Sequence, residues 1–329
     1  MDNLLLEWLL EKDEQNPSVR YFALRDLVGL DESEPELKQA AAEIMQTGPV
    51  PAILERQAEG GYWFKPGVGY SPKYQATTWT VFVLAELGAS PQDARVRKGC
   101  EYVLNHSLSK TAGFSCVANA ADRGSVICRN GNLLHSLNRL GYGQDKRVIQ
   151  AQSWMSSAVA GAAGFDYKKT YTSAPGYVCS VNAGQPCGWG AVKVMNALLD
   201  IPENQQTEMD KQAIQAGADL LLSVDVTSAA YPYTGNVSST WFRLGFPLSY
   251  WSDVLEVATV LARLRYANHP RMAGVVDWLE SKKGKDGRWR LENSLNGKMW
   301  ADIEENKKTS KWITLRVLQF LKSFEGKNQ

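Results

Sequence analysis

Four of the five cysteines are candidates for metal chemistry. Eleven residues separate Cys116 from Cys128, and seven separate Cys179 from Cys187. Four thiolates brought together form a tetrahedral ligand set that suits zinc, and the same set also holds iron-sulfur clusters. We therefore predict a zinc site, with an iron-sulfur cluster as the alternative. The spacings match no known ligand signature, so a second interpretation stays open, in which these small side chains pack in the interior.

Two carboxylates in segment 252–256 are candidates for acid-base chemistry. Asp253 and Glu256 are three positions apart, which places both side chains on one face of a helix. A carboxylic acid held in an apolar cavity keeps its proton and acts as a general acid. We predict these two residues as catalytic. Two structural roles remain open for them: capping the helix, or forming ion pairs with Arg243 or Lys311.

Aromatic and basic side chains lie near the starts of several apolar segments that we expect to be helical. Aromatic faces bind hydrophobic molecules and stabilise carbocations. Lysines near helix amino termini favour a diphosphate or carboxylate. Core packing and ordinary salt bridges are the structural alternatives. The predicted substrate-binding residues are Tyr74, Trp79, Trp189, Lys193, Trp241, Tyr250, Trp251, Lys311 and Trp312.

The elements that position these residues form a repeat. Apolar helical segments recur at intervals of about 45 to 65 residues, and each follows a more amphipathic helix. The apolar segments are 77–88, 130–141, 189–199, 253–264 and 311–322. Their amphipathic partners are 51–57, 94–106, 145–155, 210–223 and 270–282. Segments 2–12 and 17–28 add one more pair, so we expect six helical hairpins in a single domain, residues 1–329.

Helix starts are visible as capping patterns. Asn16 precedes Pro17, an N-cap followed by proline in the first turn. Thr207 stands three residues before Asp210, and Ser90 three before Asp93, which predicts a capping box at each place.

The two helix classes predict two layers. Segment 77–88 carries a single charge, so it must be buried on most faces, whereas segment 145–155 keeps a polar side. Apolar helices inside and amphipathic helices outside satisfy both patterns, in a closed ring or an open superhelix. The strand signal is weak throughout, so the fold class is all-α.

Loop lengths predict where a site lies. Roughly twenty to thirty residues lead from an amphipathic helix to its apolar partner, as at 107–127 and 224–248, against about four to eight in the other direction. If the hairpins stack in one orientation, the long loops gather at the amino ends of the apolar helices. We expect the site on that rim.

Composition excludes several function classes. The chain is 44% hydrophobic and 22% charged with a net charge of +1, which argues against nucleic acid as a partner. The first residues lack the basic region and cleavage site of a signal peptide, and no stretch reaches the roughly 18 apolar residues of a membrane span. We expect a cytoplasmic protein without a transmembrane segment; peripheral membrane contact stays open.

The repeats resemble a known superfamily through a Gln-Trp motif. Gln57-Ala-Glu-Gly-Gly61-Tyr-Trp63 matches the second half of that motif, and Lys283-Gly-Lys-Asp-Gly287-Arg-Trp289 matches it with Lys in place of Gln. Lys98-Gly99-Cys-Glu-Tyr102-Val103 supplies the first half in another repeat. The chain thus resembles the squalene-hopene cyclase and protein prenyltransferase β-subunit superfamily, and looks most similar to a bacterial branch of it. The resemblance implies an (α/α)6 toroid, in which the motif tryptophan packs against the neighbouring hairpin.

The catalytic motifs of that superfamily do not carry over. The Asp-x-Asp-Asp acid and the Asp-Asp-x-x-Asp magnesium motif are absent, and Gln185-Pro-Cys187 stands where prenyltransferases have an Asp-x-Cys zinc ligand pair. The resemblance still implies a terpenoid cyclase-like or prenyltransferase-like protein that binds an isoprenoid-like or other apolar small molecule in a central cavity. A noncatalytic, metal-stapled module that binds a peptide or protein, and a zinc-thiolate enzyme, are the alternatives.

Overall fold

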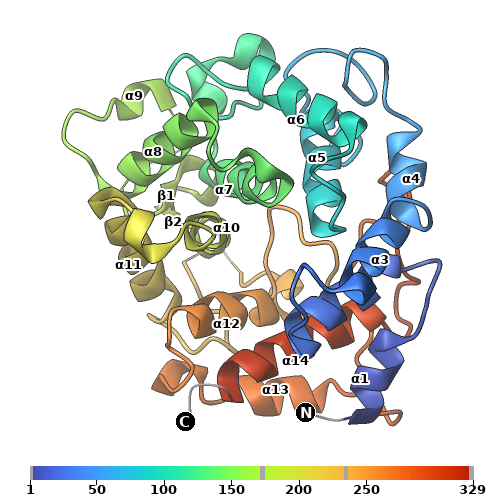
Figure 1. Ribbon diagram of the computed structural model, residues 1–329. Coiled ribbons are helices and arrows are strands. Elements are labelled where there is room, and N and C mark those ends of the chain that lie inside the picture. The colour runs from blue at the N-terminus through green and yellow to red at the C-terminus, as the bar shows by residue number, and fades with distance from the viewer. Residues whose placement is uncertain (1–2, 171–174, 233–235, 326–329) are drawn as a thin grey trace.

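The computed structural model describes residues 3–170, 175–232 and 236–325, and in them the protein is built almost entirely of helices (Figure 1). Two short antiparallel strands, β1 (Val178–Cys179) and β2 (Gln185–Pro186), form one small sheet. The predicted all-α class is confirmed.

The predicted apolar segments form one set of helices. All residues of α5 except Glu86 are buried, as its uniformly apolar sequence requires. In α10 and α12, too, most residues are buried. The set comprises α2 (Pro17–Phe22), which continues into η1 (Ala23–Val28), α5 (Thr77–Glu86), α7 (Ile127–Leu137), which continues into η4 (Asn138–Tyr142), α10 (Gly188–Leu199), α12 (Val254–Arg263) and α14 (Lys311–Glu325).

The amphipathic segments form a second set that covers the first. In Figure 1, α6, α8 and α11 lie outside α5, α7 and α10, and each pair is in contact. The second set comprises α1 (Asn3–Leu10), α4 (Pro49–Leu54), α6 (Ala94–His106), α8 (Lys146–Ala160), α11 (Glu208–Leu221) and α13 (Val275–Ser281). The remaining helices are α3 (Pro35–Ile44), α9 (Tyr167–Thr170), η2 (Ala118–Ala120), η3 (Asp122–Gly124), η5 (Ser180–Asn182), η6 (Glu203–Gln205), η7 (Ser239–Phe242) and η8 (Pro270–Met272).

The buried helices contact one another in chain order. Helix α5 packs on α7, α7 on α10, α10 on α12, and α12 on α14, which in turn contacts α2 and η1. Helices α7 and α10 approach especially closely at Gly131, where a Cβ atom would lie 2.4 Å from the backbone carbonyl carbon of Lys193. The Ser18 hydroxyl of α2 donates to the carbonyl oxygen of Leu87 at the end of α5 (2.6 Å).

The motif tryptophans have the same structural role in two hairpins. Both are buried, and each indole N–H donates to the last turn of the preceding outer helix: Trp63 to the Ile53 carbonyl (2.8 Å) and Trp289 to the Leu279 carbonyl (2.7 Å). A Cβ atom on Gly99 of the next hairpin would come within 2.8 Å of the Trp63 ring. The glycine of the Lys-Gly half-motif is therefore the surface on which the tryptophan of the preceding hairpin packs.

One predicted helix cap is confirmed and one is wrong. Thr207 and Asp210 form the expected capping box at the start of α11. At α6 the N-cap is Asp93 itself, whose carboxylate accepts from the backbone N–H groups of Arg95 and Val96, while Ser90 lies outside the helix. Asp is as good an N-cap as Ser, and it is the residue adjacent to the first helical turn.

Candidate functional site

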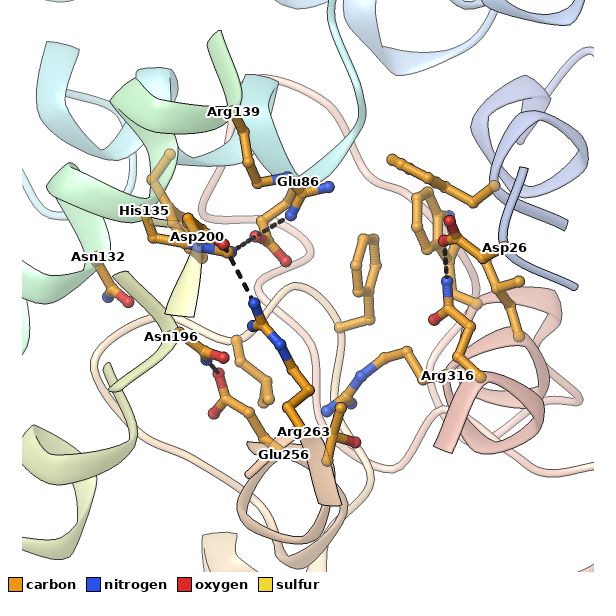
Figure 2. A pocket seen from close by; sticks show the side chains of 18 of the residues that line it. Asp26, Glu86, Asn132, His135, Arg139, Asn196, Asp200, Glu256, Arg263 and Arg316 are labelled. Carbon is orange, nitrogen blue, oxygen red and sulfur yellow. Dashed lines mark hydrogen bonds and ion pairs between the residues drawn. The ribbon is translucent and has the colours of Figure 1, made fainter. Parts of the chain in front are cut away.

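One pocket lies among the buried helices and is lined mainly by polar and charged side chains. Its volume is about 560 Å³, and α2, η1, α5, α7, η4, α10, α12 and α14 all contribute to it (Figure 2). We call it the polar pocket. Its lining residues are Phe22, Arg25, Asp26, Phe82, Glu86, Asn132, His135, Arg139, Lys193, Asn196, Asp200, Phe246, Leu248, Glu256, Thr259, Arg263, Trp312, Leu315, Arg316 and Gln319.

A histidine with two carboxylates forms one wall of the polar pocket. His135 Nδ1 lies 2.5 Å from Asp200 Oδ2, and its Nε2 lies 3.9 Å from Glu86 Oε1. Arg139 donates to the same Glu86 oxygen (3.1 Å), and Arg263 Nη2 lies 3.6 Å from Asp200 Oδ1. These side chains come from the carboxyl ends of four helices, α5, α7 with its continuation η4, α10 and α12. Dashed lines in Figure 2 mark contacts among them.

The two predicted catalytic carboxylates each pair with a basic side chain. Both oxygens of Glu256, in the polar pocket, accept from Lys193 Nζ (2.6 and 2.7 Å). Asp253 is fully buried and accepts two hydrogen bonds from Arg316 (3.0 and 3.1 Å). It also caps α12 by accepting from the Glu256 backbone N–H (2.7 Å). Asp253 therefore caps the helix, as one of the two structural alternatives predicted. Ion pairs, the other alternative, are also present, but the basic partners are Arg316 for Asp253 and Lys193 for Glu256 instead of Arg243 or Lys311.

The polar pocket has the parts of a proton-transfer site. A carboxylate hydrogen-bonded to Nδ1 fixes the orientation of an imidazole and leaves Nε2 to exchange a proton. His135 and Asp200 have this arrangement, and both line the pocket.

A second pocket lies at the amino ends of α5, α7 and α10, and we call it the aromatic pocket. Its volume is about 400 Å³, and it shares Phe82 and Asn132 with the polar pocket. The loops that precede α5, α7, α10 and α12 each contribute at least one residue. Its lining residues are Tyr70, Lys73, Thr78, Trp79, Phe82, Cys116, Val126, Cys128, Arg129, Asn132, Leu133, Val181, Trp189 and Tyr250.

Arg129 is the one buried cation in this lining, among the described residues. The side chain is 7% exposed, yet none of its three guanidinium nitrogens has a hydrogen-bond partner in the part of the chain that the structure describes. The Tyr70 ring lies 5.1 Å from its guanidinium carbon. Burial lowers the pKa of Arg129 to about 10, and burial likewise raises the pKa of the Tyr70 phenol to about 12.

The predicted aromatic residues divide between the wall of the aromatic pocket and a layer behind it. Trp79, Trp189 and Tyr250 line the pocket. Behind them, the Trp241 ring centre is 5.8 Å from that of Trp189. Two more predicted aromatics, Tyr74 and Trp251, also lie in this second layer, against Trp79 and Tyr250 respectively. The seventh, Trp312, lines the polar pocket instead.

The other predicted binding residues lie elsewhere. Lys193 lines the polar pocket, as does Trp312, which stacks on Phe246 with ring centres 3.8 Å apart. Lys311 lies outside both pockets: its Nζ is 3.5 Å from a carboxylate oxygen of Glu11 and of Asp13.

The four cysteines do not assemble into a ligand set. Within residues 3–170, 175–232 and 236–325, no three His, Cys, Asp or Glu side chains are grouped so that they could hold a metal ion. Cys116 and Cys128 line the aromatic pocket, whereas Cys179 and Cys187 do not. Burial raises the pKa of the Cys187 thiol to about 11 and that of Cys128 further.

Sequence reasoning did not select Arg129, nor the carboxylates and arginines that surround His135 in the polar pocket. A signal for the polar pocket was present, because Glu86, Asp200 and Arg263 are charged residues that each stand at the end of a mostly buried helix. Arg129 gave no such signal, because the absence of a partner is visible only in three dimensions.

Comparisons with known proteins leave the function open. No family model matches the chain, and no curated protein matches it. A solved structure, the crystal structure of a protein from Actinoplanes, aligns with 88% of this chain and 99% of its own at 14% identity and a TM-score of 0.27, too low to establish a shared fold. None of the described helices is both long and apolar enough to span a membrane.

Proposed function

We propose that this protein binds an isoprenoid-like or other apolar molecule in the aromatic pocket. The observation that carries the proposal is the wall of that pocket, where Tyr70, Trp79, Trp189 and Tyr250 surround a volume of about 400 Å³. Small-molecule sites span about 300 to 1,000 Å³ and are mostly apolar with few polar groups. Aromatic faces suit an unsaturated chain, and they would also stabilise a cation formed from it, as terpenoid cyclase-like or prenyl-transfer chemistry requires.

We also propose that the six hairpins close into an (α/α)6 toroid of the squalene-hopene cyclase and prenyltransferase β-subunit superfamily, with the long loops on one rim. The inner-helix contacts run from α5 round to α14 and α2, and the Ser18 hydrogen bond joins α2 to the end of α5. All of these helices contribute to the polar pocket, and the loops before four of them contribute to the aromatic pocket. The equivalent indole hydrogen bonds of Trp63 and Trp289 support the repeat.

Fluorescence of a neutral apolar dye, Nile red, tests the binding proposal, with farnesol as the competitor. We expect farnesol to displace the dye at one site per chain. Trp79→Ala should weaken farnesol binding by about tenfold or more, because a lost aromatic contact of about 1.5 to 3 kcal/mol exceeds the 1.4 kcal/mol of one factor of ten.

Trp278→Ala is the matched control, since this tryptophan belongs to α13 and lines neither pocket. It should leave farnesol binding unchanged. Equal effects of the two variants, or no displacement by farnesol at all, would refute the proposal.

The two alternatives, a metal-stapled binding module and a zinc-thiolate enzyme, have less support. Each needs thiol ligands in one cluster, and the described residues form no such group.

The His135–Asp200 contact favours a second candidate function, proton transfer to or from a polar substrate in the polar pocket. Imidazole nitrogen NMR tests it. We expect His135 to carry its proton on Nδ1, with a change of tautomer in the Asp200→Asn variant. A proton on Nε2 alone in the unmodified protein would exclude His135 as a base at that nitrogen.

A further inference from the structure

We infer that the molecule bound in the aromatic pocket carries a carboxylate, and that this group pairs with Arg129. The inference deepens the proposed function, because it adds the chemical class of the ligand to an apolar binding site. It rests on the burial of the guanidinium, the lack of any partner for it, and its place on the pocket wall.

An unpaired buried guanidinium is an expensive feature. Charged side chains are almost never fully buried unless they are paired, and each buried ion without a counter-charge costs several kcal/mol. Arg129 is 7% exposed, and its Nε, Nη1 and Nη2 atoms all lack an acceptor in the described part of the chain. By contrast, the guanidinium of Arg316, whose side chain is 15% exposed, is satisfied by Asp253 and by the Gly245 carbonyl. The missing counter-ion of Arg129 is therefore the feature that calls for a ligand.

Among residues 3–170, 175–232 and 236–325, no carboxylate accepts a hydrogen bond from the Arg129 guanidinium. The acidic groups that act on it electrostatically are the Cys116 and Cys128 thiols and the Tyr70 phenol. Burial keeps Cys128 and Tyr70 protonated, because it raises the pKa of both groups. The Tyr70 ring face contributes a cation-π contact, which leaves the N–H groups free to donate.

The amino end of α7 reinforces the same electrostatic preference. Arg129 lies in the first turn of α7, and no side chain caps that terminus. Uncapped N–H groups and the helix dipole favour an anion at this place.

A single planar anion fits better than a diphosphate. Within the aromatic pocket Lys73 is the other basic residue; it is exposed, with its Nζ 5.0 Å from the Tyr250 ring centre. One buried guanidinium balances one negative charge. Two of its parallel N–H groups can donate to the two oxygens of a single carboxylate. The expected ligand is thus a long apolar acid, with its head at Arg129 and its chain along Trp79 and Trp189.

Displacement of Nile red by three matched compounds tests the inference: dodecanoate, dodecanol and dodecyl phosphate. Hydrogen bonds to a charged group contribute about 1.5 to 3 kcal/mol, so dodecanoate should bind roughly 10- to 100-fold more tightly than dodecanol. Arg129→Gln should remove this difference while dodecanol still binds. Arg129→Lys should retain part of it, and Arg95→Gln, on the outer helix α6, should retain all of it.

Stability gives an independent readout. Without ligand, Arg129→Gln should unfold at a higher urea concentration than the unmodified protein, because the uncompensated charge is gone. Dodecanoate should stabilise the unmodified protein more than it stabilises the variant, in which it should bind no better than dodecanol.

The results separate this inference from the proposed function. Equal affinity for the acid and the alcohol, or a preference that survives Arg129→Gln, would overturn the inference while leaving an apolar site. Tighter binding of dodecyl phosphate than of dodecanoate would overturn the carboxylate assignment in favour of a phosphate monoester. Binding of none of the three compounds would instead refute the proposed function itself.

Discussion

Asp253 was predicted from the sequence to be catalytic. Replacing it by Asn tests whether its role is structural instead. Asp253 is fully buried at the start of α12, and Arg316 donates two hydrogen bonds to it. Asn keeps the size of the side chain and is an equally good N-cap. The substitution therefore removes the negative charge and leaves the cap in place.

The magnitude follows from the environment of Arg316. With the carboxylate gone, the guanidinium keeps its bond to the Gly245 carbonyl (2.6 Å) and has no counter-charge at Asp253. Removing one partner of a buried ion pair costs about 3 to 5 kcal/mol. Asp93→Asn is the matched control, because Asp93 caps α6 at a partly exposed site, where the exchange should cost a few tenths of a kcal/mol.

Urea unfolding followed by tryptophan fluorescence measures both variants. We expect Asp253→Asn to lose about 3 to 5 kcal/mol of the free energy of unfolding, and the double variant with Arg316→Met to recover part of that loss. Equal stability losses at Asp253 and Asp93 would refute the structural role and return Asp253 to the catalytic candidates.

Three further outcomes are expected. Trp63→Phe and Trp289→Phe should each lower the free energy of unfolding by a similar amount, about 1 to 3 kcal/mol, because each removes the indole hydrogen bond to the preceding helix and part of a buried ring; unequal losses would contradict their equivalence. Gly131→Ala should destabilise by about 1 to 3 kcal/mol in urea, because the new Cβ meets the backbone of Lys193, although Ala is the better helix former; stabilisation would show that α7 and α10 separate easily. Burial raises the pKa of Cys100 from 9.0 to about 12. Burial of the protonated thiol therefore contributes fully to the free energy of unfolding below pH 9, and this contribution is lost as pH rises toward 12, because the thiol ionises first in the unfolded chain. The Cys100→Ala variant should therefore lose less stability than the unmodified protein over that pH range, and parallel losses would contradict the shift.

Much of the helical framework could be predicted from the sequence, because hydrophobic periodicity reports burial directly. Helix α6 has the predicted bounds 94–106, and the apolar segment 77–88 contains the buried helix α5. The start of α7 was predicted three residues too late, at Asn130, since the polar residues there hide the buried Ile127 of its first turn.

The candidate sites were harder to predict because they depend on which side chains meet. Trp79 and Tyr250 were expected at a site and line the aromatic pocket. Asp253 and Lys311 were also selected by residue type and position, and both are ion-paired outside the two pockets. Arg129 stands next to Cys128, and no sequence pattern shows that one charged residue has a partner and another has none.

A crystal structure of the protein with dodecanoate tests the central claim most directly, since it locates the ligand. The account predicts the carboxylate within hydrogen-bond distance of the Arg129 guanidinium, with the alkyl chain against Trp79 and Trp189. Dodecanoate in the polar pocket, or bound with its carboxylate pointing away from Arg129, would contradict it.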